Sequence, residues 1–209
     1  IVYHKNQTLM YVYENIIFEV TIAQAQTLND ARPKRCLKWC QMRRHSTRDT
    51  TIFYVSYYAG LRAKEIAALT VGNLFDDAGA VREQFVLDSS QTKGAKTRTV
   101  WINAKLRRQL EQFRKHSLST HPTDALFQSQ KGGAFSANTM TQLFLNIYHA
   151  AGFENASSHS GRRTFITELA SKGVSVRVLA ELAGHSSIQT TQRYIDVNPQ
   201  QMSAAVELL

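Results

Sequence analysis

Apolar residues recur at helical spacing along most of the chain after residue 27. The clearest example follows Ser136, a candidate helix cap, and places five apolar residues on one face: Met140, Leu143, Phe144, Ile147 and Tyr148. A second amphipathic helix is expected after Asn103, with three apolar residues facing inward: Leu106, Leu110 and Phe113. Cap and stop signals predict further helices from Asn29 or Asp30, at 49–59 before Gly60, at 62–69, from Ser158 or Ser160 to Gly173, at 176–183 before Gly184, from Ser186 or Ser187 through Tyr194, and after Pro199.

One stretch between these helices has the pattern of a β-hairpin. Residues 85–87 and 99–102 are runs of β-favouring residues, and the polar sequence QTKGAKTR separates them. Gly94 in this loop can adopt a positive φ. The sequence therefore predicts an α+β fold, a mostly helical domain over 27–209 with one small antiparallel sheet.

The first 26 residues differ from the rest of the chain. They contain aromatic and β-branched residues with no helical period. This pattern fits a pairing strand, an arm, or a segment foreign to the natural protein. We expect residues 1–26 to be an appendage, and the sequence leaves its role open.

Charge narrows the class of partner. Lys and Arg number 25 against 16 Asp and Glu, which gives a formal net charge of +9. Basic chains commonly bind a polyanion, and nucleic acid is the first candidate. Because no apolar run approaches the roughly 20 residues that cross a bilayer, we expect a cytoplasmic protein. A DNA-binding protein there would be nucleoid-associated. Cys36 and Cys40 lie four residues apart on one helix face, and we expect two free thiols.

Residues suited to phosphate chemistry occur in several short segments. In HSGRRTF, His159 and Arg162 are three residues apart near a helix start, where an imidazole and a guanidinium suit a phosphate. In GLRAKEIAALT, Arg62 precedes Glu65 by three residues. Taken singly, the first segment would be interpreted as a surface pair without a ligand, and the second as a salt-bridged turn.

Two further segments complete the set. The hairpin loop contains Lys93 and Lys96, and LAGHSSIQTTQRYI contains His185 and Tyr194 in H-x8-Y spacing. Taken singly, the lysines would be interpreted as solvated turn residues, and residues 176–194 as a helix-turn-helix with a packed tyrosine.

The order of these segments is more specific than any one of them. GLRAKEIAALT resembles the first arginine box of the tyrosine recombinases, the phage integrase family. HSGRRTF resembles their H-x-x-R box, and LAGHSSIQTTQRYI resembles the box with the second histidine and the nucleophile. The resemblance covers roughly residues 27–209, the catalytic domain of that family.

The resemblance implies a role for each matching residue. Arg62 and Arg162 would bind the non-bridging oxygens of the scissile phosphate. His159 and His185 would form hydrogen bonds at the phosphate and help to deprotonate the nucleophile, Tyr194.

A proton must also reach the leaving 5′-oxygen. The resemblance assigns this role to Lys93 in the hairpin loop, with Lys96 as the rival. Glu65 is expected to orient an arginine rather than to react.

The implied activity is site-specific DNA recombination, by integration, excision or inversion, through a 3′-phosphotyrosine. It requires no cofactor and no metal ion. The partner would be double-stranded DNA. Four protomers would assemble on it during synapsis, and the sequence leaves open whether the protein is a monomer in solution. The alternatives are DNA relaxation of the type IB topoisomerase kind, or a helix-turn-helix regulator without catalysis.

The chain departs from the family at two places. Arg163 stands where many relatives have a histidine. Residues 1–26 are too few for the separate DNA-clamping domain of most relatives, so we expect an excised catalytic fragment or a naturally short member like the fimbrial-switch inverting recombinases. The apolar segment after Pro199 would either pass to a neighbouring subunit or pack on its own domain.

Overall fold

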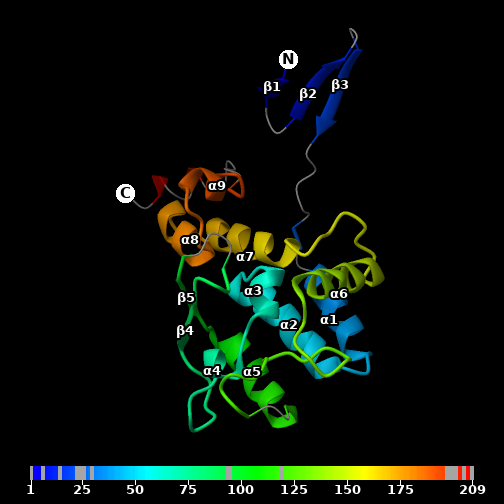
Figure 1. Ribbon diagram of the computed structural model, residues 1–209. Helices are drawn as coiled ribbons and strands as arrows, with labels where there is room; N and C mark the ends of the chain where they lie inside the picture. Colours follow the sequence, from blue (N-terminus) through cyan, green and yellow to red (C-terminus); the bar gives the residue numbers. More distant parts are fainter. Residues whose placement is uncertain are drawn as a thin grey trace.

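The computed structural model describes residues 2–5, 8–13, 16–21, 27–28, 31–92, 96–117, 120–195, 202–203 and 206–207, the first three ranges by backbone only. Figure 1 shows a helical domain with a small sheet on one side. The helices are α1 (Ala31–Gln41), α2 (Ser46–Ala59), α3 (Ala63–Ala67), α4 (Val71–Leu74), α5 (Ala104–His116), α6 (Ala137–Ala150), α7 (Ser160–Ser171), α8 (Val176–Ala183) and α9 (Ile188–Gln192). The strands are β1 (Val2–Lys5), β2 (Thr8–Tyr13), β3 (Ile16–Thr21), β4 (Gln84–Leu87) and β5 (Arg98–Trp101).

Helix α2 forms the centre of the domain. It packs against α1, α5 and α7, so its neighbours cover it on several sides (Figure 1). Ile52, Phe53 and Val55 are buried together with Thr51 and Ser56. Burying one large apolar side chain contributes about 1.5–3 kcal/mol, so this helix anchors the surrounding layer. The helix begins at Ser46, three residues before the predicted start.

The amphipathic helices agree with the sequence. All inward positions predicted for α5 and α6 are buried. The side chains of Asn103 and Ser136 accept hydrogen bonds from the main-chain N–H of Leu106 and Thr139, as expected of caps.

Two predicted helix ends differ from the structure. Helix α7 begins at Ser160, one of the two predicted starts, but ends at Ser171, two residues before the predicted end at Gly173. Helix α9 ends at Gln192 and does not run through Tyr194. The predicted cap at Asn29 or Asp30 lies outside the described residues.

The predicted hairpin is confirmed. Strands β4 and β5 pair antiparallel, with Phe85 opposite Val100 and Leu87 opposite Arg98. These four residues are buried, while the alternating ones are exposed. The loop position Gly94 lies outside the described residues.

The N-terminal strands and the segment after Pro199 lie at the two ends of the chain. Strands β1, β2 and β3 form an antiparallel sheet in sequence order, so the β-leaning segment is three strands rather than one. After Pro199, residues 202–203 and 206 are helical, and the rest of that predicted helix lies outside the described residues. In the part of the chain that the structure describes, no helix has the length and apolar character to cross a membrane.

Candidate active site

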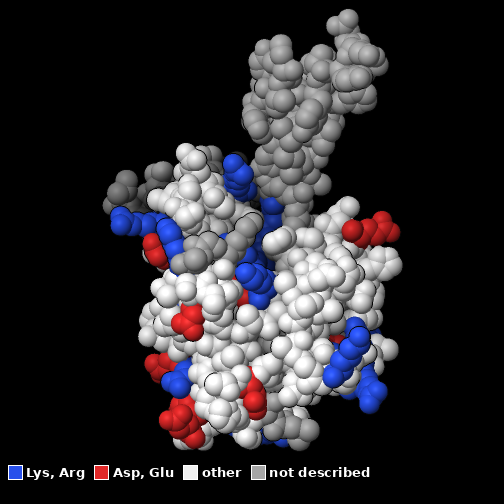
Figure 2. Space-filling model, in the orientation of Figure 1, with Lys and Arg blue, Asp and Glu red and all other residues white. Residues whose placement is uncertain are grey.

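A cleft of about 950 Å³ opens between α3, β5 and the turn after α8. Its lining includes Arg62, Lys96, Arg98, Trp101, Glu181 and His185. Figure 1 shows α7, α8 and α9 toward one end of the domain, α3 below α7 near the middle, and α5 at the opposite end. On the face in Figure 2, Lys and Arg side chains gather in the hollow at the upper centre, whereas most visible acidic side chains lie lower.

Glu65 holds two arginines of this cleft. One carboxylate oxygen accepts from the Arg62 guanidinium, 2.7 Å, and the other accepts from Arg62 N and the Arg98 guanidinium, both 2.8 Å. The Glu65 side chain is buried. The sequence predicted that Glu65 orients an arginine, and the structure confirms this and adds a second arginine.

Arg98 is the member of the cluster that sequence reasoning missed. It is buried on the inner face of β5, and its guanidinium also donates to the Leu182 carbonyl, 2.7 Å. The signal was available, because Arg98, Val100 and Ile102 alternate and must share one face of a strand.

Arg162 is buried behind the cleft. Its guanidinium donates to the Gly60 carbonyl, 2.8 Å, and to the Ala183 carbonyl. Both carbonyls belong to helix ends, since Gly60 and Gly184 adopt left-handed conformations that close α2 and α8. Burial, and then the positive charge of Arg62 and Arg98, lower the pKa of Arg162 to about 9. The group therefore remains charged at neutral pH.

His159 and Arg162 lie in different surroundings. His159 is exposed at the N-cap of α7, one turn before the buried Arg162. The structure therefore places the two predicted phosphate ligands on the same helix end, one at the surface and one inside.

His185 and Tyr194 lie face to face. Their ring centroids are 5.7 Å apart, with the planes 19° from parallel. The Thr191 hydroxyl lies 2.8 Å from His185 Nδ1 and fixes the imidazole. Arg163 lies on the Tyr194 ring, with its guanidinium carbon 5.4 Å from the centroid, so the residue that departs from the family pattern contacts the expected nucleophile.

The charge of the cleft acts on His185. Burial, and then the positive charges of Arg162, Arg62 and Arg98, lower the pKa of His185 from 6.5 to about 4. His185 is therefore a neutral imidazole near pH 7, and one of its ring nitrogens can accept a hydrogen bond.

Of the two candidate lysines, the structure describes Lys96. Lys93 lies outside the described residues. Lys96 is exposed and lines the cleft, and its main-chain carbonyl accepts a hydrogen bond from the Thr92 hydroxyl, 2.7 Å.

Known proteins match this chain over most of its length. The model of the phage integrase family matches residues 22–201. Tyrosine recombinase XerD of Neisseria meningitidis is 31% identical over 161 residues, which is 73% of this chain and 52% of that protein. Tyrosine recombinase XerC of Pseudomonas fluorescens is 33% identical over 161 residues, 77% of this chain and 52% of that protein. The chain thus spans about half the length of these relatives.

Solved structures share the fold. The crystal structure of XerA recombinase has a TM-score of 0.71 at 24% identity and covers 88% of this chain and 65% of its own. The catalytic domain of bacteriophage HP1 integrase has a TM-score of 0.62 at 23% identity and covers 88% of this chain and 95% of its own. With the family model, they show that this chain belongs to the phage integrase family and has the tyrosine recombinase catalytic fold.

Proposed function

We propose that this chain cleaves and rejoins double-stranded DNA in the cytoplasm, at the nucleoid, as the catalytic domain of a site-specific recombinase. The observation that carries the proposal is the convergence of residues far apart in sequence. Arg62 and His185 line one cleft, Arg162 bonds to carbonyls at the two helix ends beside it, and Tyr194 stacks on His185. Relatives that are tyrosine recombinases support the same activity.

The proposed step exchanges one phosphodiester for another. The Tyr194 oxygen attacks the phosphorus and forms a phosphotyrosine bond at the 3′ side, while the bond to the 5′-oxygen breaks. Arg62 and Arg162 stabilise the charge that grows on the non-bridging oxygens. The 5′-hydroxyl of another strand reverses the step, so the energy of the broken bond is retained for rejoining.

The proton of Tyr194 needs an acceptor. A tyrosine hydroxyl ordinarily has a pKa near 10, so attack at neutral pH requires a base or a cationic surrounding. His185 is neutral, stacks on Tyr194 and uses Nδ1 with Thr191. We assign acceptance of the Tyr194 proton to the other nitrogen of His185, Nε2. His159 would donate a hydrogen bond to the phosphate.

The leaving 5′-oxygen needs a proton donor. We assign this role to Lys93 and retain Lys96, at the rim of the cleft, as the rival. Residues 27–209 would form the catalytic domain and residues 1–26 an appendage. Four such protomers would assemble on DNA during synapsis.

Covalent trapping tests the proposal. Duplex DNA from the native locus, nicked beside the candidate site, lets the short cleaved strand diffuse away and prevents rejoining. We expect an adduct that survives denaturation in SDS, and peptide mapping should place DNA on Tyr194. Tyr194→Phe should abolish the adduct.

Tyr58→Phe is the matched control, because it removes one hydroxyl from a half-buried tyrosine of α2. This variant should form the adduct at the wild-type level. Intact DNA binding without any adduct would contradict catalysis and favour a DNA-binding regulator.

A further inference from the structure

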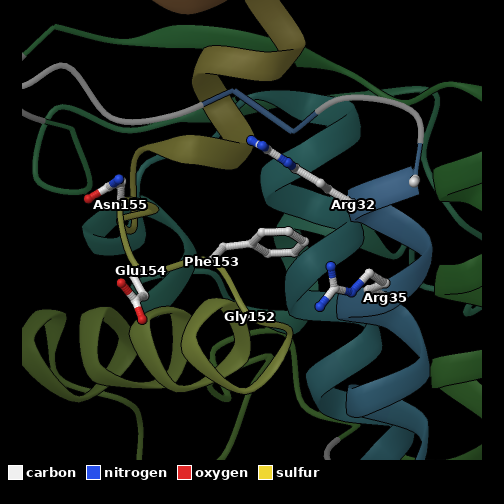
Figure 3. Close-up of a pocket in the computed structure, with 7 residues that line it drawn as sticks. Arg32, Arg35, Gly152, Phe153, Glu154 and Asn155 are labelled. Carbon is white, nitrogen blue, oxygen red and sulfur yellow. The ribbon is translucent and has the colours of Figure 1, made fainter.

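A second pocket lies apart from the cleft, where the start of α1 meets the loop between α6 and α7. Its volume is about 470 Å³, and its lining includes Arg32, Arg35, Gly152, Phe153, Glu154 and Asn155 (Figure 3). None of these residues lines the cleft that contains Arg62 and His185.

Two arginines share one aromatic ring in this pocket. The guanidinium carbons of Arg32 and Arg35 lie 5.2 and 4.9 Å from the centre of the Phe153 ring. Figure 3 shows the ring directed toward α1, with both side chains beside it. Phe153 is buried, so it fixes both cations at the surface. The Arg35 guanidinium lies close to the loop, since a Cβ at Gly152 would be 2.6 Å from it.

The pair places two positive charges beside one ring, an arrangement that suits an anion. Within the described part of the chain, no carboxylate lies at ion-pair distance from Arg35. Glu154 lines the pocket but makes no ion pair with a described residue. Two adjacent guanidinium groups match the oxygens of a phosphate, to which each can donate in parallel.

Short connections tie the pocket to the helix of Arg162. The Arg32 guanidinium donates to the Thr27 carbonyl, 3.0 Å, and Leu28 N donates to the Thr164 hydroxyl of α7, 2.8 Å. On the other side, the pocket loop leads into α7. Arg162 follows Asn155 by seven positions, so their Cα atoms are at most about 25 Å apart. That distance corresponds to about seven phosphates along one DNA strand.

We propose that Arg32 and Arg35, held on Phe153, bind a backbone phosphate of the DNA that flanks the cleavage site. The inference rests on the proposed function, because the cleft must hold DNA for the pocket to meet its flank. Glu154 opposes capture of a small free anion. A phosphate of a strand already bound in the cleft arrives at high local concentration and overcomes this repulsion.

The salt dependence of binding tests this contact. In a Tyr194→Phe background, where DNA stays intact, Arg35→Gln and Arg32→Gln should each weaken binding. Loss of one phosphate contact should reduce the slope of log K against log salt by about 0.9. The control is Arg108→Gln, which makes the same charge change at an exposed position of α5 at the other end of the domain (Figure 1). Its slope should match that of the parent.

A phosphate scan locates the contact. Neutral methylphosphonates are placed singly within about seven nucleotides of the cleaved bond. One or two positions should weaken binding of the parent several-fold and leave Arg35→Gln unaffected. Equal effects on both proteins at every position would overturn the inference.

Two further measurements distinguish a DNA contact from a free-anion site and from a failure of the proposed function. If inorganic phosphate raises the melting temperature of the parent but not of Arg35→Gln, while their DNA slopes agree, the pocket binds free anions and the DNA contact is wrong. Adduct formation with nicked DNA is measured separately, with Tyr194 restored. If the chain forms the adduct but the arginine variants keep the salt slope of the parent, only the proposed phosphate contact is rejected. If the chain with Tyr194 and both arginines intact neither binds DNA nor forms an adduct, the proposed function itself is rejected.

Discussion

Glu65 supplies the negative charge nearest to a group of arginines. It bonds to Arg62 and Arg98, while Arg162 lies close enough to be influenced by both. Removing one partner of a buried ion pair costs roughly 3–5 kcal/mol, because the remaining charge is left without compensation. Glu65→Gln should lower the free energy of unfolding by about that amount, as measured by urea denaturation.

Glu111→Gln removes the same charge from an exposed position of α5 and serves as the control. It should leave the free energy of unfolding within about 0.5 kcal/mol of wild type. A Glu65→Gln protein as stable as this control would show that the arginines do not need the carboxylate for folding.

The depressed pKa of His185 makes stability depend on pH. The folded protein binds a proton at His185 only near pH 4, whereas the unfolded chain binds it near 6.5. As the pH falls from 6.5 to 4, the unfolded state binds the proton first, so the free energy of unfolding decreases. Above pH 7 neither state binds the proton, and His185 does not change the free energy of unfolding. Allowing for solvent screening of this partly exposed ring, we expect a loss of about 1–2 kcal/mol.

The measurement compares urea unfolding at pH 7 and pH 4.5. His185→Gln should lose less stability between the two values than wild type does, since it retains no titrating ring. His121→Gln, at an exposed site outside the cleft, is the control and should follow wild type. If His185→Gln follows wild type as well, His185 does not titrate in the expected range.

Single residues were predictable where they belong to a motif. The segments that contain Arg62, Arg162 and His185 were identified by their order along the chain, and the structure brings them to one site. Arg98 was missed because the sequence analysis assigned it to the polar loop QTKGAKTR, where an arginine is expected to be solvated. Its burial depends on Glu65, which lies 33 positions away in sequence.

At the scale of elements, the turn between α2 and α3 positions two arginines. Gly60 has φ 65°, its carbonyl accepts from Arg162, and a Cβ there would lie 2.5 Å from the Phe165 ring. Gly60→Ala therefore combines backbone strain with a clash and should cost about 2–4 kcal/mol of stability. The rate of adduct formation should fall as well, because the carbonyl that holds Arg162 must move.

Gly133→Ala is the matched control. Gly133 has no positive φ, and a Cβ there would meet no atom within 4 Å, so its replacement should change neither stability nor rate. A Gly60→Ala protein with wild-type adduct formation would show that the turn does not set the position of Arg162.

Elements with one apolar face were predictable, and those shaped by local hydrogen bonds were not. Helices α5 and α6 matched the sequence because their caps and apolar stripes agree. Helix α9 ended early because Tyr194 N and Ile195 N bond to carbonyls three residues back, 2.9 and 3.1 Å, which tightens the chain out of the α-helix. The short α4 has no apolar period and was not foreseen.

At the scale of the whole molecule, the family could be predicted but the geometry of the site could not. The order of the motifs identified the family without any structure. The contacts of the Tyr194 ring with His185 and with Arg163 depend on how α7, α8 and α9 pack. A single sequence does not determine such packing, because each helix could place its polar face in several ways.

The segment after Pro199 bears on the assembly of protomers. Met202 and Val206 are 54% and 68% exposed and lie four positions apart in one apolar segment, so together they offer an apolar surface that another protein can cover. Under the proposed assembly of protomers on DNA, we expect a neighbouring protomer to provide that surface. Deleting residues 199–209 should therefore reduce the formation of paired-site complexes at least tenfold, while single-site adduct formation falls less than threefold.

The single variant Val206→Ser should reproduce part of this difference. Val86→Ser, at a similarly apolar exposed position of β4, should leave both measurements unchanged. Gel-shift assays with two labelled DNA sites report pairing, and SDS-resistant adducts report cleavage. Equal losses of pairing and cleavage would mean that the segment stabilises its own domain, because only a surface shared between protomers can affect pairing while sparing the chemistry at one site.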